Sequence, residues 1–177
     1  MNMSTLPPVV AQAVAAIALG LLGASGVVKL VDPEPTTGAM SIARLPASNP
    51  LSRLLGLVEV VVSVIALAFA GPAMLASAAL YSAFTVFTLY ALTTRIPLQS
   101  CGCFGREDTP PTTIHTVFNA TATGALVYLF LTGGVPVDWA LPSVELVLYL
   151  GFTMVAVYAT YLLMTRLPQV LEFTRNP

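Results

Sequence analysis

The chain has 177 residues, of which 56% are hydrophobic and only 8% are charged. This is too little polar surface to cover a water-soluble globular protein. The composition therefore predicts an integral membrane protein and excludes a soluble domain. The net charge of -1 and the singly scattered Lys and Arg residues give no basic footprint for nucleic acid. We therefore expect membrane lipid, and not nucleic acid, around this protein.

Five apolar segments are long enough to cross a bilayer, whose hydrocarbon core needs about 20 apolar residues per helix. They cover residues 8–31, 51–70, 73–94, 113–132 and 143–165. The sequence thus predicts one integral membrane domain over residues 1–177, an all-α polytopic membrane helix bundle with a four-helix core and a fifth transmembrane helix. Gly71 and Pro72 leave no room for a loop, so the second and third spans should form a tight antiparallel hairpin.

The first span contains small residues that permit close approach of a neighbouring helix. They are Gly20, Gly23, Ala24, Ser25 and Gly26. A long polar loop follows the first span. Within it, residues 38–45 are expected to form a short helix along the membrane interface, with Met40, Ile42 and Leu45 on one side. Such a helix is either a lid over a site or a plain connector.

Two ionisable residues fall within the first two spans. Glu59 lies about eight residues into the second span, roughly 12 Å below the surface at 1.5 Å per residue. A carboxyl at that depth is costly, so it belongs either to a functional site or to a structural pair with Lys29 or Arg53. Lys29 itself, near the end of the first span, is expected to extend its side chain to the lipid headgroups.

Aromatic residues recur every three positions in the second half of the third span, at Tyr81, Phe84, Phe87 and Tyr90. This stripe favours helix packing. The alternative is an aromatic wall for the flat ring of a quinone.

The two cysteines, Cys101 and Cys103, are separated by one glycine in the loop between the third and fourth spans. Glycine allows the bent backbone that a disulfide would need, and so small a ring is strained, which favours accepting electrons from another dithiol. Closing so short a loop constrains little of the unfolded chain, which argues against a structural staple. The helix that follows, His115, and Arg95 or Arg106 can stabilise the thiolate that exchange requires.

Three uses of this pair are compatible with the residues: thiol–disulfide exchange, a soft-metal site such as Cu(I), and a purely structural pair. Zinc is not favoured, because two cysteines and the only histidine leave one ligand short. His115 and Asn119 follow at a spacing of four, on one face of the fourth span. A lone histidine is more often structural, but the nearby cysteines make His115 a candidate for their chemistry.

The CGCFG block at residues 101–105, followed by His115 and Asn119, resembles the MauE proteins of methylamine utilisation. The end of the first span, GVVKLVDP at residues 26–33, and Glu59 look like the MauE and DoxX-like pattern. The resemblance covers roughly residues 15–130. It implies a small bundle of the cell's inner (plasma) membrane, related in architecture to DsbB and vitamin K epoxide reductase.

The resemblance also implies a function and a set of site residues. MauE proteins are associated with maturation of the disulfide-rich methylamine dehydrogenase small subunit, working with a thioredoxin-like, MauD-type partner. Cys101 and Cys103 would be the redox pair. The candidate catalytic residues are therefore Cys101, Cys103 and His115, and the supporting residues are Lys29, Glu59, Arg95 and Asn119.

Two opposite predictions can be made for the side of the membrane on which the cysteines lie. All seven Lys and Arg residues fall on the face that contains the cysteine loop, which predicts a cytoplasmic position. The resemblance implies the extracytoplasmic side.

Three functions follow from these residues. The first is a membrane thiol–disulfide oxidoreductase that passes electrons between the cysteines and a thioredoxin-like partner, with a membrane quinone as a possible final acceptor. The second is a copper-binding or copper-delivery protein. The third is a non-catalytic subunit of a membrane complex, assembled through the small residues of the first span.

Overall fold

The computed structural model describes residues 6–94 and 110–175, and the side chains of residues 8–94 and 110–166. The described chain is helical and contains no strand. Its helices are α1 (Leu6–Val31), α2 (Glu34–Ile42), α3 (Asn49–Phe69), α4 (Pro72–Thr94), α5 (Thr113–Thr132) and α6 (Ser143–Arg175). All but α2 are long and apolar enough to cross a membrane. The all-α, multi-pass membrane prediction is confirmed.

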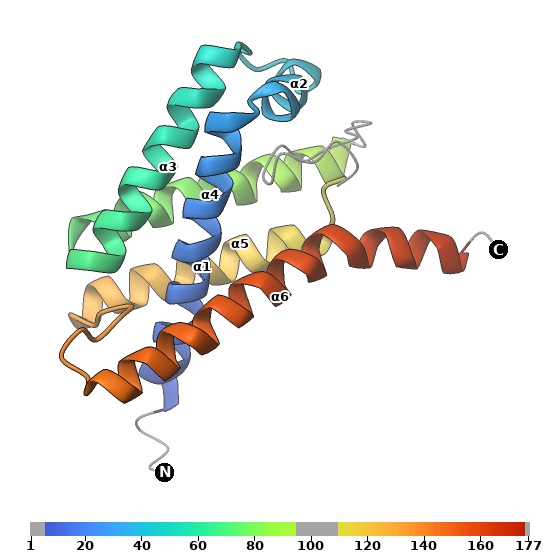
Figure 1. Cartoon of the computed structure of the whole chain (residues 1–177). Helices are drawn as coiled ribbons and strands as arrows, with labels where there is room; N and C mark the ends of the chain where they lie inside the picture. Colours follow the sequence, from blue (N-terminus) through green and yellow to red (C-terminus); the bar gives the residue numbers. More distant parts are fainter. Residues whose placement is uncertain (1–5, 95–109, 176–177) are drawn as a thin grey trace.

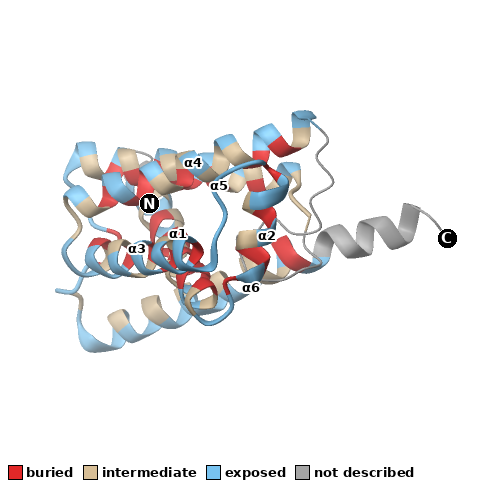
Figure 2. Ribbon diagram, turned by 90° about the horizontal axis from the view of Figure 1, so that it is seen from above, coloured by how far each residue is buried: buried red, intermediate tan, exposed pale blue. Residues whose placement is uncertain are grey.

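The helices form two antiparallel pairs, α1 with α3 and α4 with α5, and α1 also packs against α5 and α6 (Figure 1). The largest core cluster draws only on α1, α3, α4 and α5. Its buried members are Ala15, Ala18, Leu19, Leu22, Ala66, Met74, Ala78, Tyr81, Ala122, Ala125, Leu126 and Leu129. Figure 2 shows α6 mostly exposed outside this core. The prediction of a four-helix core plus a fifth helix is thus confirmed.

Both limits of each span lie within two residues of the predicted ones. The spans cover residues 8–31, 49–69, 72–94, 113–132 and 143–166. Two starts are earlier than predicted because a proline lies in the first turn: Pro50 in α3 and Pro72 in α4. Proline is compatible with the first turn, where its missing N–H has no helical acceptor. Gly71, with φ of +64°, makes the predicted tight turn between α3 and α4.

The short helix after α1 was predicted with the wrong limits. It covers Glu34–Ile42, again with a proline, Pro35, in its first turn. Pro35, Thr36 and Ala39 are buried, whereas Ile42 is 47% exposed and Leu45 lies beyond the helix. Thr37 fixes this orientation, because its hydroxyl bonds with Asn49 Oδ1 and with Ser52 Oγ in the first turn of α3.

One end of the bundle collects the features that matter for function, and we call it the α2 end. The helices alternate in direction, so the end of α1, the start of α3, the end of α4 and the start of α5 all lie at this end. Here α2 covers the last part of α4, with Ala39 packed against Ala91 and Phe87.

Candidate functional site

Lys29 and Glu59 form a buried ion pair between α1 and α3. Lys29 Nζ lies 2.9 Å from Glu59 Oε2, and the two side chains are 1% and 0% exposed. Lys29 also donates to Ser25 Oγ at 2.5 Å. Its ammonium lies 5.6 Å from the centre of the Phe84 ring, within the range of a cation–π contact. The predicted extension of Lys29 to the headgroups is therefore wrong: an inward carboxylate and hydroxyl satisfy the ammonium instead.

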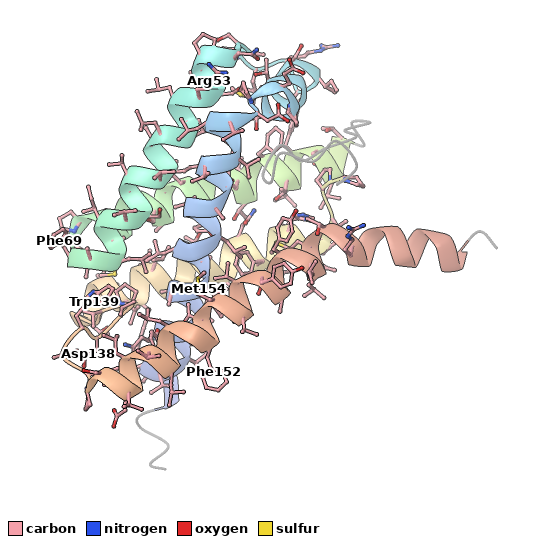
Figure 3. All side chains as sticks on the ribbon, viewed as in Figure 1. Arg53, Phe69, Asp138, Trp139, Phe152 and Met154 are labelled. Atoms are coloured by element: carbon pink, nitrogen blue, oxygen red, sulfur yellow. The ribbon has the colours of Figure 1, made fainter. Side chains whose placement is uncertain are left out.

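Arg53, the other predicted partner of Glu59, does not reach it. Arg53 is exposed near the α2 end of α3, whereas Phe69 and Trp139 lie towards the opposite end (Figure 3). Of the two predicted partners, Lys29 is therefore the one that pairs with Glu59. The hydrogen bonding of the Glu59 carboxylate is nevertheless incomplete, since its Oε1 atom is buried without a hydrogen-bond partner among the described residues.

Two glycines bring α1 and α3 close enough for this pair to form. A Cβ atom on Gly26 would lie 2.5 Å from the carbonyl oxygen of Gly56, and one on Gly56 would lie 2.6 Å from that of Gly26. Real Cβ atoms do not approach oxygen so closely, so the crossing excludes any side chain at either position. The prediction that small residues of the first span permit close helix approach is borne out at Gly26.

His115 and Asn119 lie on the buried face of α5, 2% and 7% exposed. The backbone N–H of Thr112 donates to His115 Nδ1 at 3.3 Å, and the Thr112 hydroxyl lies 2.9 Å from the same nitrogen. Because a backbone N–H can only donate, Nδ1 is the acceptor, and the neutral imidazole has its proton on Nε2. His115 thus caps the start of α5, a structural role.

The second ring nitrogen of His115 is not used in this cap. Nε2 is buried and has no hydrogen-bond partner among the described residues. Buried polar atoms in proteins are nearly always hydrogen-bonded, so an exception calls for an explanation.

The aromatic stripe of α4 mainly packs against neighbouring helices. The Tyr81 hydroxyl donates to the carbonyl of Ala18 at 2.6 Å. The Tyr81 ring meets those of Phe84 and Phe118 edge to face, with centroids 6.2 and 6.1 Å apart. Tyr90, at the end of the stripe, is 47% exposed.

A pocket of about 220 Å³ lies beneath α2, between α1, α3 and α4. Phe84 and Phe87 of the stripe contribute to its wall, and Lys29 lines it as well. Apart from Lys29 and Thr36 the lining is apolar. The second half of the stripe thus borders an open space at the α2 end.

Cys101, Cys103, Arg95 and Arg106 lie outside the described residues. The segment that contains them begins after Thr94, the last residue of α4, and ends before Pro110, close to the start of α5. Both flanking residues belong to the α2 end, as Lys29 and His115 do. Within residues 6–94 and 110–175, no group of three or more His, Cys, Asp and Glu residues could hold a metal ion.

A comparison with protein families adds the decisive observation. The family described as "Methylamine utilisation protein MauE" matches residues 7–132, which include α1 but for its first residue, α2 to α5 and the CGCFG block. The chain belongs to the MauE family. This multi-pass membrane protein is therefore associated with methylamine utilisation. Comparisons with curated proteins and with solved structures gave no match.

Sequence reasoning missed two residues that contribute to the buried Lys29–Glu59 pair of this MauE protein. Gly56 was not singled out, although it lies three residues before Glu59, as Gly26 lies before Lys29. Ser25 was predicted only as a small residue that permits close helix approach, but it accepts a hydrogen bond from Lys29. A small residue one turn away from an intramembrane charge is a signal that could have indicated both.

Proposed function

We propose that this MauE protein is a membrane thiol–disulfide redox protein that exchanges electrons between Cys101/Cys103 and a thioredoxin-like, MauD-type partner. The substrates would be disulfide-containing proteins such as methylamine dehydrogenase, and the location would be the inner (plasma) membrane. The observation that carries the proposal is the match to the MauE family over residues 7–132. This range contains the chain's only two cysteines, which are separated by a single glycine.

The proposed exchange conserves atoms and electrons. A thiolate of the reduced partner attacks the Cys101–Cys103 disulfide, and a mixed disulfide forms as one cysteine leaves as thiolate. The partner's second thiolate then attacks this mixed disulfide, which releases the oxidised partner. The pair now holds two electrons as a dithiol. A membrane quinone would accept these electrons with two protons, which yields a quinol and restores the disulfide.

The pocket beneath α2 supports a place for the quinone ring. It lies at the α2 end and is bordered by Phe84, Phe87 and the Lys29 side chain. Aromatic and apolar walls with a small number of polar groups, here Lys29 and Thr36, are typical of sites for flat, partly polar rings.

Exchange is tested by the redox state of the partner in cells that express Cys101→Ser, Cys103→Ser or the double variant. We expect the partner to accumulate as dithiol in all three. One single variant should also retain a mixed disulfide with the partner, because the resolving thiol is missing. A double variant that leaves the partner's redox state unchanged contradicts the proposal, and stoichiometric copper in the purified reduced protein would favour metal handling instead.

Thiol labelling of intact cells with a membrane-impermeant maleimide settles the side of the membrane. The chain contains only two cysteines, so every label reports on this pair. Labelling that requires prior mild reduction indicates an extracytoplasmic disulfide. Labelling that requires permeabilisation, and no reductant, indicates a cytoplasmic dithiol and agrees with the charge distribution.

A further inference from the structure

A small cavity in the interior of the bundle is lined by His115, whose Nε2 atom is buried and has no hydrogen-bond partner among the described residues. Its volume is about 20 Å³, and its wall includes His115 and Asn119 of α5 and Ser25 of α1. The remaining lining side chains are Leu21, Leu22, Tyr81, Phe84, Phe118 and Met164. The cavity therefore joins three polar side chains from two helices inside an otherwise apolar wall.

The size of this cavity restricts what it can hold. A water molecule needs roughly 10–15 Å³ of such space and two to four polar partners. The cavity meets both conditions, whereas a quinone ring, a metal with its ligand sphere or a lipid headgroup would not fit without moving helices. Apolar cavities stay empty, but this one has an imidazole N–H donor in its wall.

His115 supplies the observation that points to a ligand. Its Nδ1 accepts from Thr112 at 3.3 Å, which leaves the proton on Nε2. Nε2 is buried, and none of the described residues accepts its hydrogen bond. A buried donor without an acceptor costs about 1–3 kcal/mol.

We infer that the cavity binds one water molecule, which accepts the hydrogen bond of His115 Nε2–H and bonds to Ser25 and Asn119. Ser25 in turn accepts from Lys29, and Lys29 donates to Glu59. The water thus completes one chain of hydrogen bonds that runs from Thr112, at the start of α5, to Glu59, in the middle of α3. It links the two polar groups of the bundle without any direct contact between their side chains. This water site does not depend on the thiol chemistry proposed above.

The test uses the fact that the chain contains a single histidine. The full-length protein, labelled with ¹⁵N-histidine and placed in lipid nanodiscs, gives one set of imidazole signals. We expect a neutral imidazole protonated on Nε2, and a cross-peak between that proton and water. Direct contact of this proton with bulk water is not expected, because His115 is 2% exposed.

Asn119→Leu fills the cavity with an apolar side chain and should abolish the water cross-peak. The Nδ1 signal should stay unchanged, since Thr112 still holds that nitrogen. Thr121→Val is the matched control: Thr121 lies on the same helix, is exposed, and bonds only to the carbonyl of Val117. It should retain the cross-peak.

Three results would overturn the inference. They are a wild-type imidazole protonated on Nδ1, a wild-type Nε2 proton without a water cross-peak, and a cross-peak that persists at full intensity in Asn119→Leu. The wild-type measurement decides on its own if the variant does not fold. None of these readouts depends on partner oxidation, so failure of the water site and failure of the thiol chemistry are distinguishable.

Discussion

Gly26 and Gly56 lie opposite each other where α1 crosses α3, and each precedes one member of the buried ion pair by three residues. A Cβ atom on Gly26 would come within 2.9 Å of Glu59 Cβ, and one on Gly56 within 2.8 Å of Lys29 Cβ. Each glycine therefore faces the charged residue of the other helix. The same close approach that excludes side chains at the crossing brings the ammonium to the carboxylate.

Replacing Gly56 with Ala should force α1 and α3 apart. The new Cβ would lie 2.6 Å from the backbone oxygen of Gly26, which cannot move away without moving its helix. We expect a loss of stability of about 1–3 kcal/mol, as for other overpacked sites. Thermal unfolding in detergent measures it. Gly124→Ala is the control, because no atom lies within 4 Å of the place where its Cβ would be. Equal losses of stability in both variants would contradict the close contact of α1 and α3 at Gly56.

Removing one member of the ion pair should cost more than removing both. Glu59→Leu leaves the Lys29 ammonium buried without a counter-charge, at a cost of about 3–5 kcal/mol. The double variant Lys29→Met/Glu59→Leu removes both charges and should be more stable than Glu59→Leu alone. Arg53→Met, an exposed position on α3, should change stability by no more than about 0.5 kcal/mol. If the loss of stability in the double variant equals the sum of the losses in the two single variants, the pairing is contradicted.

Two substitutions of His115 separate its structural role from a chemical one. Glutamine at this third helical position can still reach back to the N-cap backbone, so His115→Gln should keep most of the stability. His115→Ala loses the cap, and we expect a loss of about 0.5–2 kcal/mol.

The thiol-exchange rate of the same two variants then tests the chemistry. If the imidazole assists the cysteines, exchange falls in both variants, including the stable His115→Gln. Wild-type exchange rates in His115→Gln would show that His115 is structural only.

Tyr81→Phe should weaken the contact between α4 and α1. The substitution removes the hydrogen bond from the Tyr81 hydroxyl to the Ala18 carbonyl and leaves the ring contacts with Phe84 and Phe118 in place. The expected loss is about 0.5–1.5 kcal/mol in thermal unfolding. Tyr90→Phe, at the exposed end of the stripe, should have a smaller effect.

Much of the fold could be predicted from the sequence because its signals are local. Apolar length alone gives the five spans, since a bilayer demands that length, and Gly71-Pro72 gives the hairpin between α3 and α4. Helix limits were missed where a proline lies in the first turn: α2, α3 and α4 begin at Glu34, Asn49 and Pro72, earlier than predicted. Proline is compatible with the first helical turn, so a proline near a helix start does not by itself fix the first helical residue.

The CGCFG block and the apolar spans by themselves determined that this protein crosses the membrane and belongs with MauE. Only the tertiary structure decided that Glu59 pairs with Lys29 and not with Arg53, and that Lys29 points inward. The physical reason is that helical periodicity specifies which residues share a face but not which helix that face meets. Here the meeting depends on two glycines 30 residues apart in the sequence, whose missing side chains let two backbones touch.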